Sequence, residues 1–269
     1  MQLKNKKYFA AVSVALLLTG ASLANAAAPI DVTWNPSGAG ITTAGAFTFD
    51  NVLINTYSNI DITSGGTAFS EQGFAKLVTF SNNGTGTGSP DFGAPGGTPY
   101  SIYFSFTATG TQTAGVPSTG SFTTLNFSLL GASGVTTFTP NGVGVFSATG
   151  NPTVTLATGH LTSGTTTLSS AFQPSAQILT TFTPNPAFPG FFVNPNALTQ
   201  LDFTAAFTNT NSVVTQFDLG GGNTRLSLNG GGGNATFAPA IPEPDTYGML
   251  LAGLGLFAFI ARRRGQKVA

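Results

Sequence analysis

Large apolar side chains alternate with small hydroxyl side chains along several stretches of this chain, and this alternation limits the fold more than any other feature. Between residues 100 and 106 every second side chain is large and apolar, and residues 47–50 and 201–207 repeat the pattern. A period of two places the apolar side chains on one face of a strand. The sequence therefore predicts an all-β domain with antiparallel strands, arranged as a β-sandwich or a jelly roll.

Clusters of Gly, Asn, Pro and Ser separate these stretches, for example at residues 82–84 and 140–142, and they indicate turns. The run Gly220–Gly222 also predicts a turn. The run Gly230–Gly233 predicts a flexible loop, followed by a last short strand at Ala235–Ala238.

Two segments depart from a regular alternation. Phe122 lies three residues before Leu125, which predicts a strand with a break in its register. Residues 70–80 are ambiguous between a strand and a short helical turn, because Phe74, Leu77 and Phe80 are three residues apart.

The charges are concentrated at the two ends of the chain. Of the nine Lys and Arg residues, only Lys76 and Arg225 lie between residues 27 and 238, against seven acidic residues, so this part has a net charge of −5. It has no basic patch, and we therefore expect no nucleic-acid partner. The chain has no cysteine and 24 Phe, so the domain depends on a hydrophobic core rich in aromatic side chains.

Residues 1–26 have the three parts of a secretory signal peptide. Three lysines lie among the first seven residues, residues 10–18 are almost all apolar, and Ala24 and Ala26 form a small-x-small site for signal peptidase. The apolar part is shorter than the roughly 20 residues that a membrane-spanning helix needs. We expect export of the chain and an extracellular all-β domain at residues 27–238.

The other end, residues 239–265, has the pattern of a membrane segment with a defined orientation. An uncharged apolar stretch at about 246–261 predicts a single transmembrane helix that begins after the two prolines. A basic cluster follows directly and marks the cytoplasmic side. The residues concerned are Pro242, Glu243 and Pro244 before the helix, and Arg262, Arg263 and Arg264 after it.

The Pro-Glu-Pro tripeptide, the helix and the terminal arginines together resemble the PEP-CTERM sorting domain. The resemblance implies exosortase as the processing partner, with cleavage near residues 242–244. It also implies a host that makes an extracellular polysaccharide. The protein would be anchored in the membrane during sorting and would then reach the cell surface or the extracellular matrix.

Three strings in the domain are similar to the flocculation-associated branch of PEP-CTERM proteins. They are residues 47–61, residues 100–106 and residues 190–193. This resemblance implies a role in holding cells together with exopolysaccharide, and it carries over no active-site residue.

The sequence offers few groups for chemistry. We expect the single histidine, His160, to be a solvent-facing residue in a turn. The chain has no cysteine with which it could bind a metal and no Gly-x-Ser-x-Gly motif that would indicate a catalytic triad. Asp50 and Asp61 are candidates for a pair of glycosidase carboxylates. With Asp31 they are also candidates for a calcium site. We expect no catalytic residue, no metal and no cofactor.

Three functions remain open. We expect a non-enzymatic surface or matrix protein that supports cell aggregation, floc or biofilm formation with exopolysaccharide, and self-association through sheet edges is compatible with this role. A carbohydrate-binding module would instead need an exposed aromatic platform, for which Trp34, Tyr57 and Tyr100 are the candidates. A secreted hydrolase would need Asp50 and Asp61 close together.

Overall fold

The computed structural model of the chain describes residues 28–92, 97–150, 153–195 and 201–239. The predicted signal peptide and the predicted helix at 246–261 lie outside these ranges. Within them, no helix is both long enough and apolar enough to cross a membrane.

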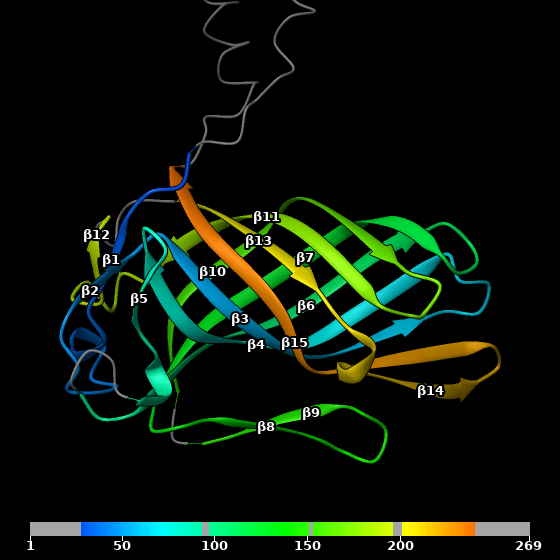
Figure 1. Ribbon diagram of the computed structural model, residues 1–269, viewed down its shortest axis with the longest axis horizontal. Coiled ribbons are helices and arrows are strands. Elements are labelled where there is room, and N and C mark those ends of the chain that lie inside the picture. The colour runs from blue at the N-terminus through cyan, green and yellow to red at the C-terminus, as the bar shows by residue number, and fades with distance from the viewer. Residues whose placement is uncertain (1–27, 93–96, 151–152, 196–200, 240–269) are drawn as a thin grey trace, which may run out of the picture. The chain divides into compact units, whose positions relative to one another are not determined.

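Eight antiparallel strands form one sheet that closes on itself as a barrel (Figure 1). The order around the barrel is β3, β4, β6, β7, β10, β11, β13 and β15, and β15 pairs with both β13 and β3. The strands are β3 (Asn51–Ile62), β4 (Ala68–Asn82), β6 (Tyr100–Gln112), β7 (Ser118–Ser133), β10 (Thr153–Leu168), β11 (Pro174–Pro184), β13 (Leu201–Thr208) and β15 (Asn223–Pro239).

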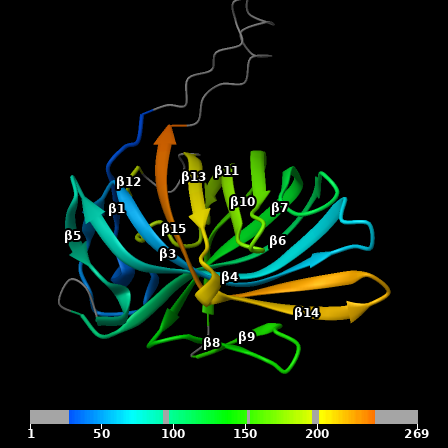
Figure 2. The ribbon, with the colours of Figure 1, turned by 45° about the vertical axis from the view of Figure 1, so that its right-hand side comes forward.

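Shorter elements lie between these strands or extend from them. They are β1 (Val32–Trp34), β2 (Phe47–Phe49), β5 (Thr85–Gly88), β8 (Thr137–Pro140), β9 (Phe146–Thr149), β12 (Phe192–Asn194) and β14 (Val214–Gly220), with the 3-10 helices η1 (Pro36–Ala39), η2 (Pro90–Phe92) and η3 (Asn211–Val213). Figure 2 shows β14 diverging from the strands of the barrel.

The all-β prediction is confirmed, whereas the sandwich or jelly roll is not. Each barrel strand lies beside its predecessor in the chain, and the last strand closes the ring. The inward side chains of this single closed sheet therefore face one another across a shared core, and they do not come from two sheets packed face to face. An alternation of period two is the same in both arrangements, so the sequence pattern could not distinguish them.

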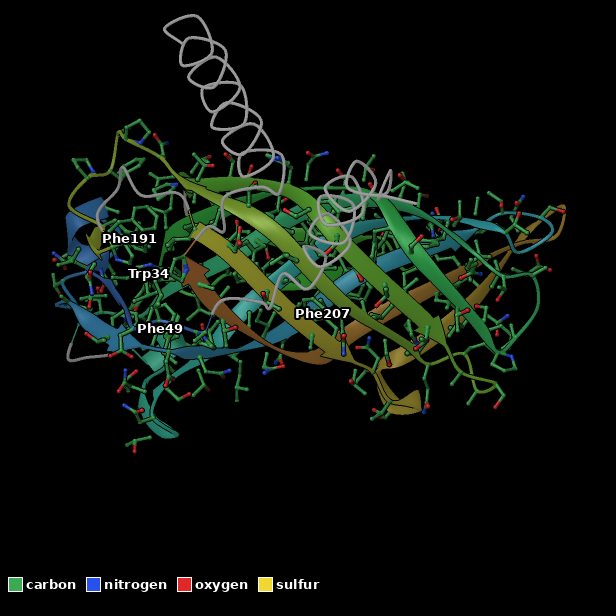
Figure 3. The ribbon with its side chains drawn as sticks, turned by 90° about the horizontal axis from the view of Figure 1, so that it is seen from above. Trp34, Phe49, Phe191 and Phe207 are labelled. Atoms are coloured by element: carbon green, nitrogen blue, oxygen red, sulfur yellow. The ribbon has the colours of Figure 1, made fainter. Side chains whose placement is uncertain are left out.

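An aromatic plug fills one end of the barrel. We define it as Trp34 with the rings around it: Phe49, Phe80, Phe191, Phe192 and Phe237. The small sheet of β12, β1 and β2 supplies several of these rings and lies over this end (Figures 1 and 3). Trp34 is 1% exposed, and its ring centroid lies 4.8 to 6.2 Å from its five neighbours.

The hairpin of β8 and β9 covers part of the outer face of the barrel. Its Phe138 stacks on Tyr57 and Phe74, with ring centroids 5.0 and 4.9 Å away. Lys76 and Ser227 hold its ends, because they donate hydrogen bonds to the carbonyl oxygens of Thr136 and Gly144 at 3.3 and 3.0 Å. The hairpin therefore buries a small apolar cluster on the outer face of the barrel, which includes Tyr103 and Phe146.

The prediction of a flexible loop at Gly230–Gly233 is wrong. These residues lie inside β15, which pairs with β3 across a register shift between Asn229 and Gly231. Gly230 has φ +83°, a conformation that glycine adopts without a steric penalty. The glycine run therefore forms a bulge within a long strand rather than a loop before a short one.

Two other local predictions are confirmed, and one ambiguity is resolved. Gly221 and Gly222 form a turn between β14 and β15. The register break near Phe122 is present as a shift in the pairing of β6 with β7, between Thr109 and Gly110. The ambiguous segment at residues 70–80 is part of strand β4.

Truncation of the plug should destabilise the barrel strongly. We expect Trp34→Ala to lower the free energy of unfolding by about 3–5 kcal/mol, the usual cost of removing a large buried aromatic side chain. Urea unfolding measures the loss. Leu53→Ala is the matched control, because Leu53 is 48% exposed and should change stability by about 0.5 kcal/mol or less. Equal losses in the two variants would contradict the role of the plug.

Candidate functional site

A cavity of about 80 Å³ lies in the half of the barrel away from the plug. Along β3 its lining extends from Ile54 to Ile62, and along β15 it includes Leu226 and Leu228, whereas Phe237 of the same strand belongs to the plug. The volume exceeds the roughly 10–15 Å³ that one water molecule requires. The cavity is thus a space that side chains leave open in the core.

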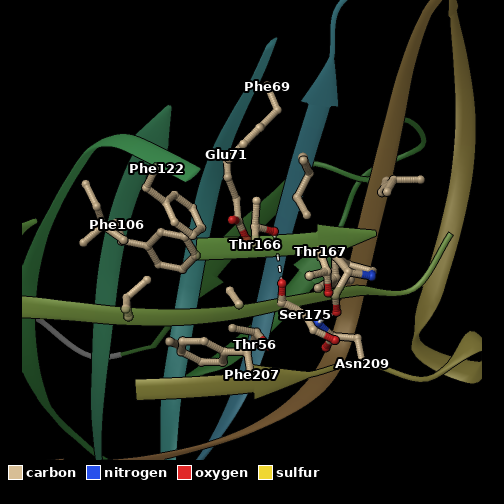
Figure 4. A pocket seen from close by; sticks show the side chains of 18 of the residues that line it. Thr56, Phe69, Glu71, Phe106, Phe122, Thr166, Thr167, Ser175, Phe207 and Asn209 are labelled. Carbon is tan, nitrogen blue, oxygen red and sulfur yellow. Dashed lines mark hydrogen bonds between the residues drawn. The ribbon is translucent and has the colours of Figure 1, made fainter. Parts of the chain in front are cut away.

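Most of the cavity wall is apolar. Figure 4 shows aromatic rings from several strands around it. Its aromatic side chains are Phe69, Phe104, Phe106, Phe122, Phe127, Phe203 and Phe207. Aliphatic residues of β3, β4, β7, β10, β11 and β15 complete this part of the wall. Such a surface suits the apolar part of a small molecule.

Glu71 is the one ionisable residue in the described wall of the cavity. It lies on β4, and its Oε1 accepts a hydrogen bond of 2.7 Å from the hydroxyl of Ser58 on β3. Burial raises the pKa of Glu71 to about 7, and the hydrogen bond from Ser58 opposes this change. The carboxyl group therefore changes its charge near neutral pH.

Two buried oxygen atoms of the wall have no hydrogen-bond partner within the structure. They are Thr56 Oγ1 and Asn209 Oδ1, on side chains 5% and 6% exposed. Both atoms lie beside Gly231 of β15, where an added Cβ would be 2.7 Å from Thr56 Oγ1 and would overlap Asn209 Oδ1. The absence of a side chain at residue 231 keeps space for these two polar groups.

A hydrogen bond within the protein fixes the orientation of the side-chain amide of Asn209. Its Nδ2 donates a hydrogen bond of 2.9 Å to the carbonyl oxygen of Pro174, at the start of β11. Because this bond holds the nitrogen on the side of β11, Oδ1 is oriented toward Gly231 and Thr56. Figure 4 shows Asn209, Thr56 and Ser175 around the same part of the cavity.

Glu71 was not among the functional candidates predicted from the sequence. It lies in the segment whose secondary structure was ambiguous, between Phe69 and the buried Ala75 of β4. Once that segment is assigned to a strand, Glu71 shares the inward face with Phe69, and an inward acidic residue is unusual. The signal was present, but it depended on the strand assignment.

The structure does not bring Asp50 and Asp61 together. They lie at opposite ends of β3, eleven positions or about 35 Å apart. Asp61 forms an ion pair with Arg225, whose Nη2 donates a hydrogen bond of 2.7 Å. Asp50 accepts a hydrogen bond of 2.9 Å from the backbone amide of Asn83. Neither the paired glycosidase carboxylates nor a shared cation site of these residues is present.

Asp31 has a separate environment, where its Oδ1 accepts a hydrogen bond of 3.1 Å from Asn82. Among the residues that the structure describes, no three His, Cys, Asp or Glu side chains gather as a metal site would require.

His160 is exposed, as predicted, but it lies within strand β10 and not in a turn. Its Nδ1 is 3.0 Å from the hydroxyl of Thr181 on β11. The prediction of a turn was wrong because the glycine before it pairs within the sheet, opposite Phe127.

The candidate aromatic platform is not formed. Trp34 lies in the plug, and Tyr100 is fully buried, which raises its pKa. Tyr57 is half-buried under Phe138. These three rings therefore do not form a flat exposed surface for a sugar.

The predicted sorting and processing residues, Pro242 to Pro244, the arginines at 262–264 and the signal peptidase site at Ala24 and Ala26 lie outside the described residues. A family model described as a PEP-CTERM protein-sorting motif matches residues 240–264. The motif indicates an exported protein that is anchored in the membrane before exosortase processes it. No curated protein and no solved structure matches the chain.

Glu71 should make the stability of the protein depend on pH. The native state binds this proton more tightly than the unfolded chain does, so the free energy of unfolding should fall as pH rises from about 4.5 to about 7. We expect a loss of about 1–3 kcal/mol by pH 8 relative to pH 5.

Glu71→Gln keeps the shape and an acceptor for Ser58 but has no ionisable group. In this variant the loss between pH 5 and pH 8 should disappear, and the variant should be the more stable protein at pH 8. Urea unfolding at the two pH values measures both effects. An unchanged pH dependence in the variant would show that another group causes it.

Proposed function

We propose that this protein is a non-enzymatic component of the cell surface or extracellular matrix that supports cell aggregation, floc or biofilm formation in contact with exopolysaccharide. The observation that carries the proposal is the PEP-CTERM sorting motif at residues 240–264, which follows an all-β domain. Similarity of residues 47–61, 100–106 and 190–193 to the flocculation-associated branch gives the proposal its direction.

The outer face of β6, β7 and β10 supports contact with a neutral polysaccharide. Beyond the part that the hairpin of β8 and β9 covers, exposed hydroxyl and amide side chains lie along it, and the hydroxyl of Thr109 on β6 is 2.7 Å from that of Thr124 on β7. We call this surface the hydroxyl face. Its exposed members are Thr107, Thr109, Thr111, Ser121, Thr123, Thr124, Asn126, Thr158 and Thr165. Such groups form hydrogen bonds with sugar hydroxyls as readily as with water.

Both basic side chains of the described domain are already paired with acidic side chains, so they are not free to bind an anionic polysaccharide. Lys76 is paired with Asp91 at 2.8 Å, and Arg225 is paired with Asp61. The strands β6, β7 and β10 contain no Asp, Glu, Lys or Arg, so the outer face that they form is uncharged and rich in hydroxyl groups.

Contact between copies of the chain is compatible with this role. In the part of the sheet that the structure describes, β14 pairs with β15 on one side and with no strand on the other. A strand edge of this kind accepts another strand. The alternative of a carbohydrate-binding module loses its predicted platform, since Trp34 and Tyr100 are buried.

Deletion of the gene should disperse the host culture. We expect re-expression of the intact chain to restore settling, whereas a chain with Pro242→Ala, Glu243→Ala and Pro244→Ala should not restore it, because exosortase would not process it. The measurement is the settling rate, with immunoblots for amount and size of the chain. Normal settling of the deletion strain would contradict the proposed function.

Negative charge on the hydroxyl face should weaken retention in the matrix. We expect Thr107→Glu with Thr158→Glu to increase the fraction of protein released into the medium several-fold, because buried carboxylates at a sugar contact lose hydration. Thr215→Glu, on the exposed face of β14, is the matched control. Equal release of all three proteins would assign the contact to another surface.

A further inference from the structure

We propose that the cavity in the barrel binds a small amphipathic amine, with its apolar chain among the phenylalanines and its ammonium group donating hydrogen bonds to Glu71, Asn209 and Thr56. This inference does not rest on the surface role above. It concerns the interior of the barrel, whereas the surface role concerns the outer face and the sorting segment.

The location suits a ligand. An eight-stranded barrel has an interior just wide enough to be filled by side chains or to hold one small ligand. Here the plug fills one half, and the other half keeps a cavity of about 80 Å³. At the rim, Thr167 of β10 is exposed and Ser175 of β11 is half-buried, so the cavity borders on solvent there.

Three donor groups of the wall already have acceptors within the protein. Asn209 Nδ2 donates to Pro174, and Gln112 Nε2 donates to the carbonyl oxygen of Gly66 at 3.0 Å. The hydroxyl of Thr166 donates to the carbonyl oxygen of Ser175 at 3.0 Å (Figure 4).

The free polar groups of the wall are mainly acceptors, although the hydroxyl of Thr56 can donate as well as accept. Asn209 Oδ1 and Thr56 Oγ1 have no partner, and the carboxyl group of Glu71 receives one hydrogen bond, from Ser58. A buried acceptor without a donor costs about 1–3 kcal/mol. The wall is therefore complementary to a ligand that brings donors, and an ammonium group brings three.

The charges of the wall select between classes of amphipathic ligand. No Lys, Arg or His is among the lining residues, so a carboxylate or phosphate head would be buried without a counter-charge, which is strongly unfavourable. An ammonium group would instead meet the carboxylate of Glu71, in a site of low polarity where such a pair interacts strongly.

The ionisation of Glu71 gives the binding a distinctive pH dependence. Its pKa of about 7 means that it becomes a carboxylate between about pH 6 and pH 8, while an alkylamine, like lysine, stays protonated. Glu71 is the titratable group of the described wall, and the charged groups on the neighbouring strands, Asp61 and Arg225, pair with each other. Affinity for an amine should thus rise over this interval.

The test is calorimetric titration of the protein, purified as the cells export it, with n-hexylamine, 1-hexanol and hexanoate. We expect saturable binding of one hexylamine per chain, weaker binding of hexanol and none of hexanoate. Affinity for hexylamine should rise about tenfold from pH 6 to pH 8, and affinity for hexanol should not change.

Two variants assign the binding to the cavity. Glu71→Gln should weaken hexylamine binding at pH 8 by about 10- to 100-fold, the range expected for loss of a charged hydrogen bond, and should change hexanol binding less than threefold. Gly231→Ala places a methyl group against Asn209 and Thr56 and should weaken both ligands. Gly232→Ala is its control, since the nearest atom to the new Cβ is 3.8 Å away.

Two outcomes would overturn the proposal. If none of the three compounds binds saturably, the cavity holds water alone. If all three bind equally and neither Glu71→Gln nor Gly231→Ala alters them, they bind elsewhere. Thermal unfolding of each variant checks the fold, and because Glu71→Gln keeps the size of the side chain, it tests the proposal even if Gly231→Ala is destabilised.

Discussion

The pairing of β15 with two partners at once is the constraint on which the rest of the structure depends. The strand hydrogen-bonds to β3 along one side and to β13 along the other, and this converts a chain of hairpins into a ring. Once the ring is closed, all inward side chains face one enclosed volume. Its content is then set by residue size at each inward position and, at one end, by the rings that the small sheet of β12, β1 and β2 supplies.

One half receives large rings, and the other receives smaller or polar residues among its rings. At the plug, Trp34 packs against five phenylalanines and is almost completely buried. Further along the same strands, Thr56, Ser58, Glu71 and Gly231 take inward positions. These side chains do not fill the space, and they place oxygen atoms in it. The cavity is thus a direct result of the sequence of β3, β4 and β15.

The sequence predicted the strands and their inward faces well, because period two is a local property of each strand. Closure of the ring was beyond it, since pairing of β15 with β3 joins residues more than 150 positions apart. The glycine run at 230–233 was misread because a bulge and a loop have the same composition; the neighbouring strand and the oxygens of Thr56 and Asn209 distinguish them. Trp34 and Tyr100 were read as a possible surface, although large aromatic side chains of a cysteine-free domain belong more often to its core.

The two ends of the described domain lie side by side. The backbone amide of Ile30 donates a hydrogen bond of 2.9 Å to the carbonyl oxygen of Phe237, at the plugged end of the barrel. The last strand finishes at Pro239, three residues before the Pro-Glu-Pro tripeptide. The ring is therefore complete upstream of the sorting segment, and cutting the chain at 242–244 removes no residue that closes it. A cut there would leave the whole barrel folded, and the new end of the chain would lie only a few residues beyond Pro239.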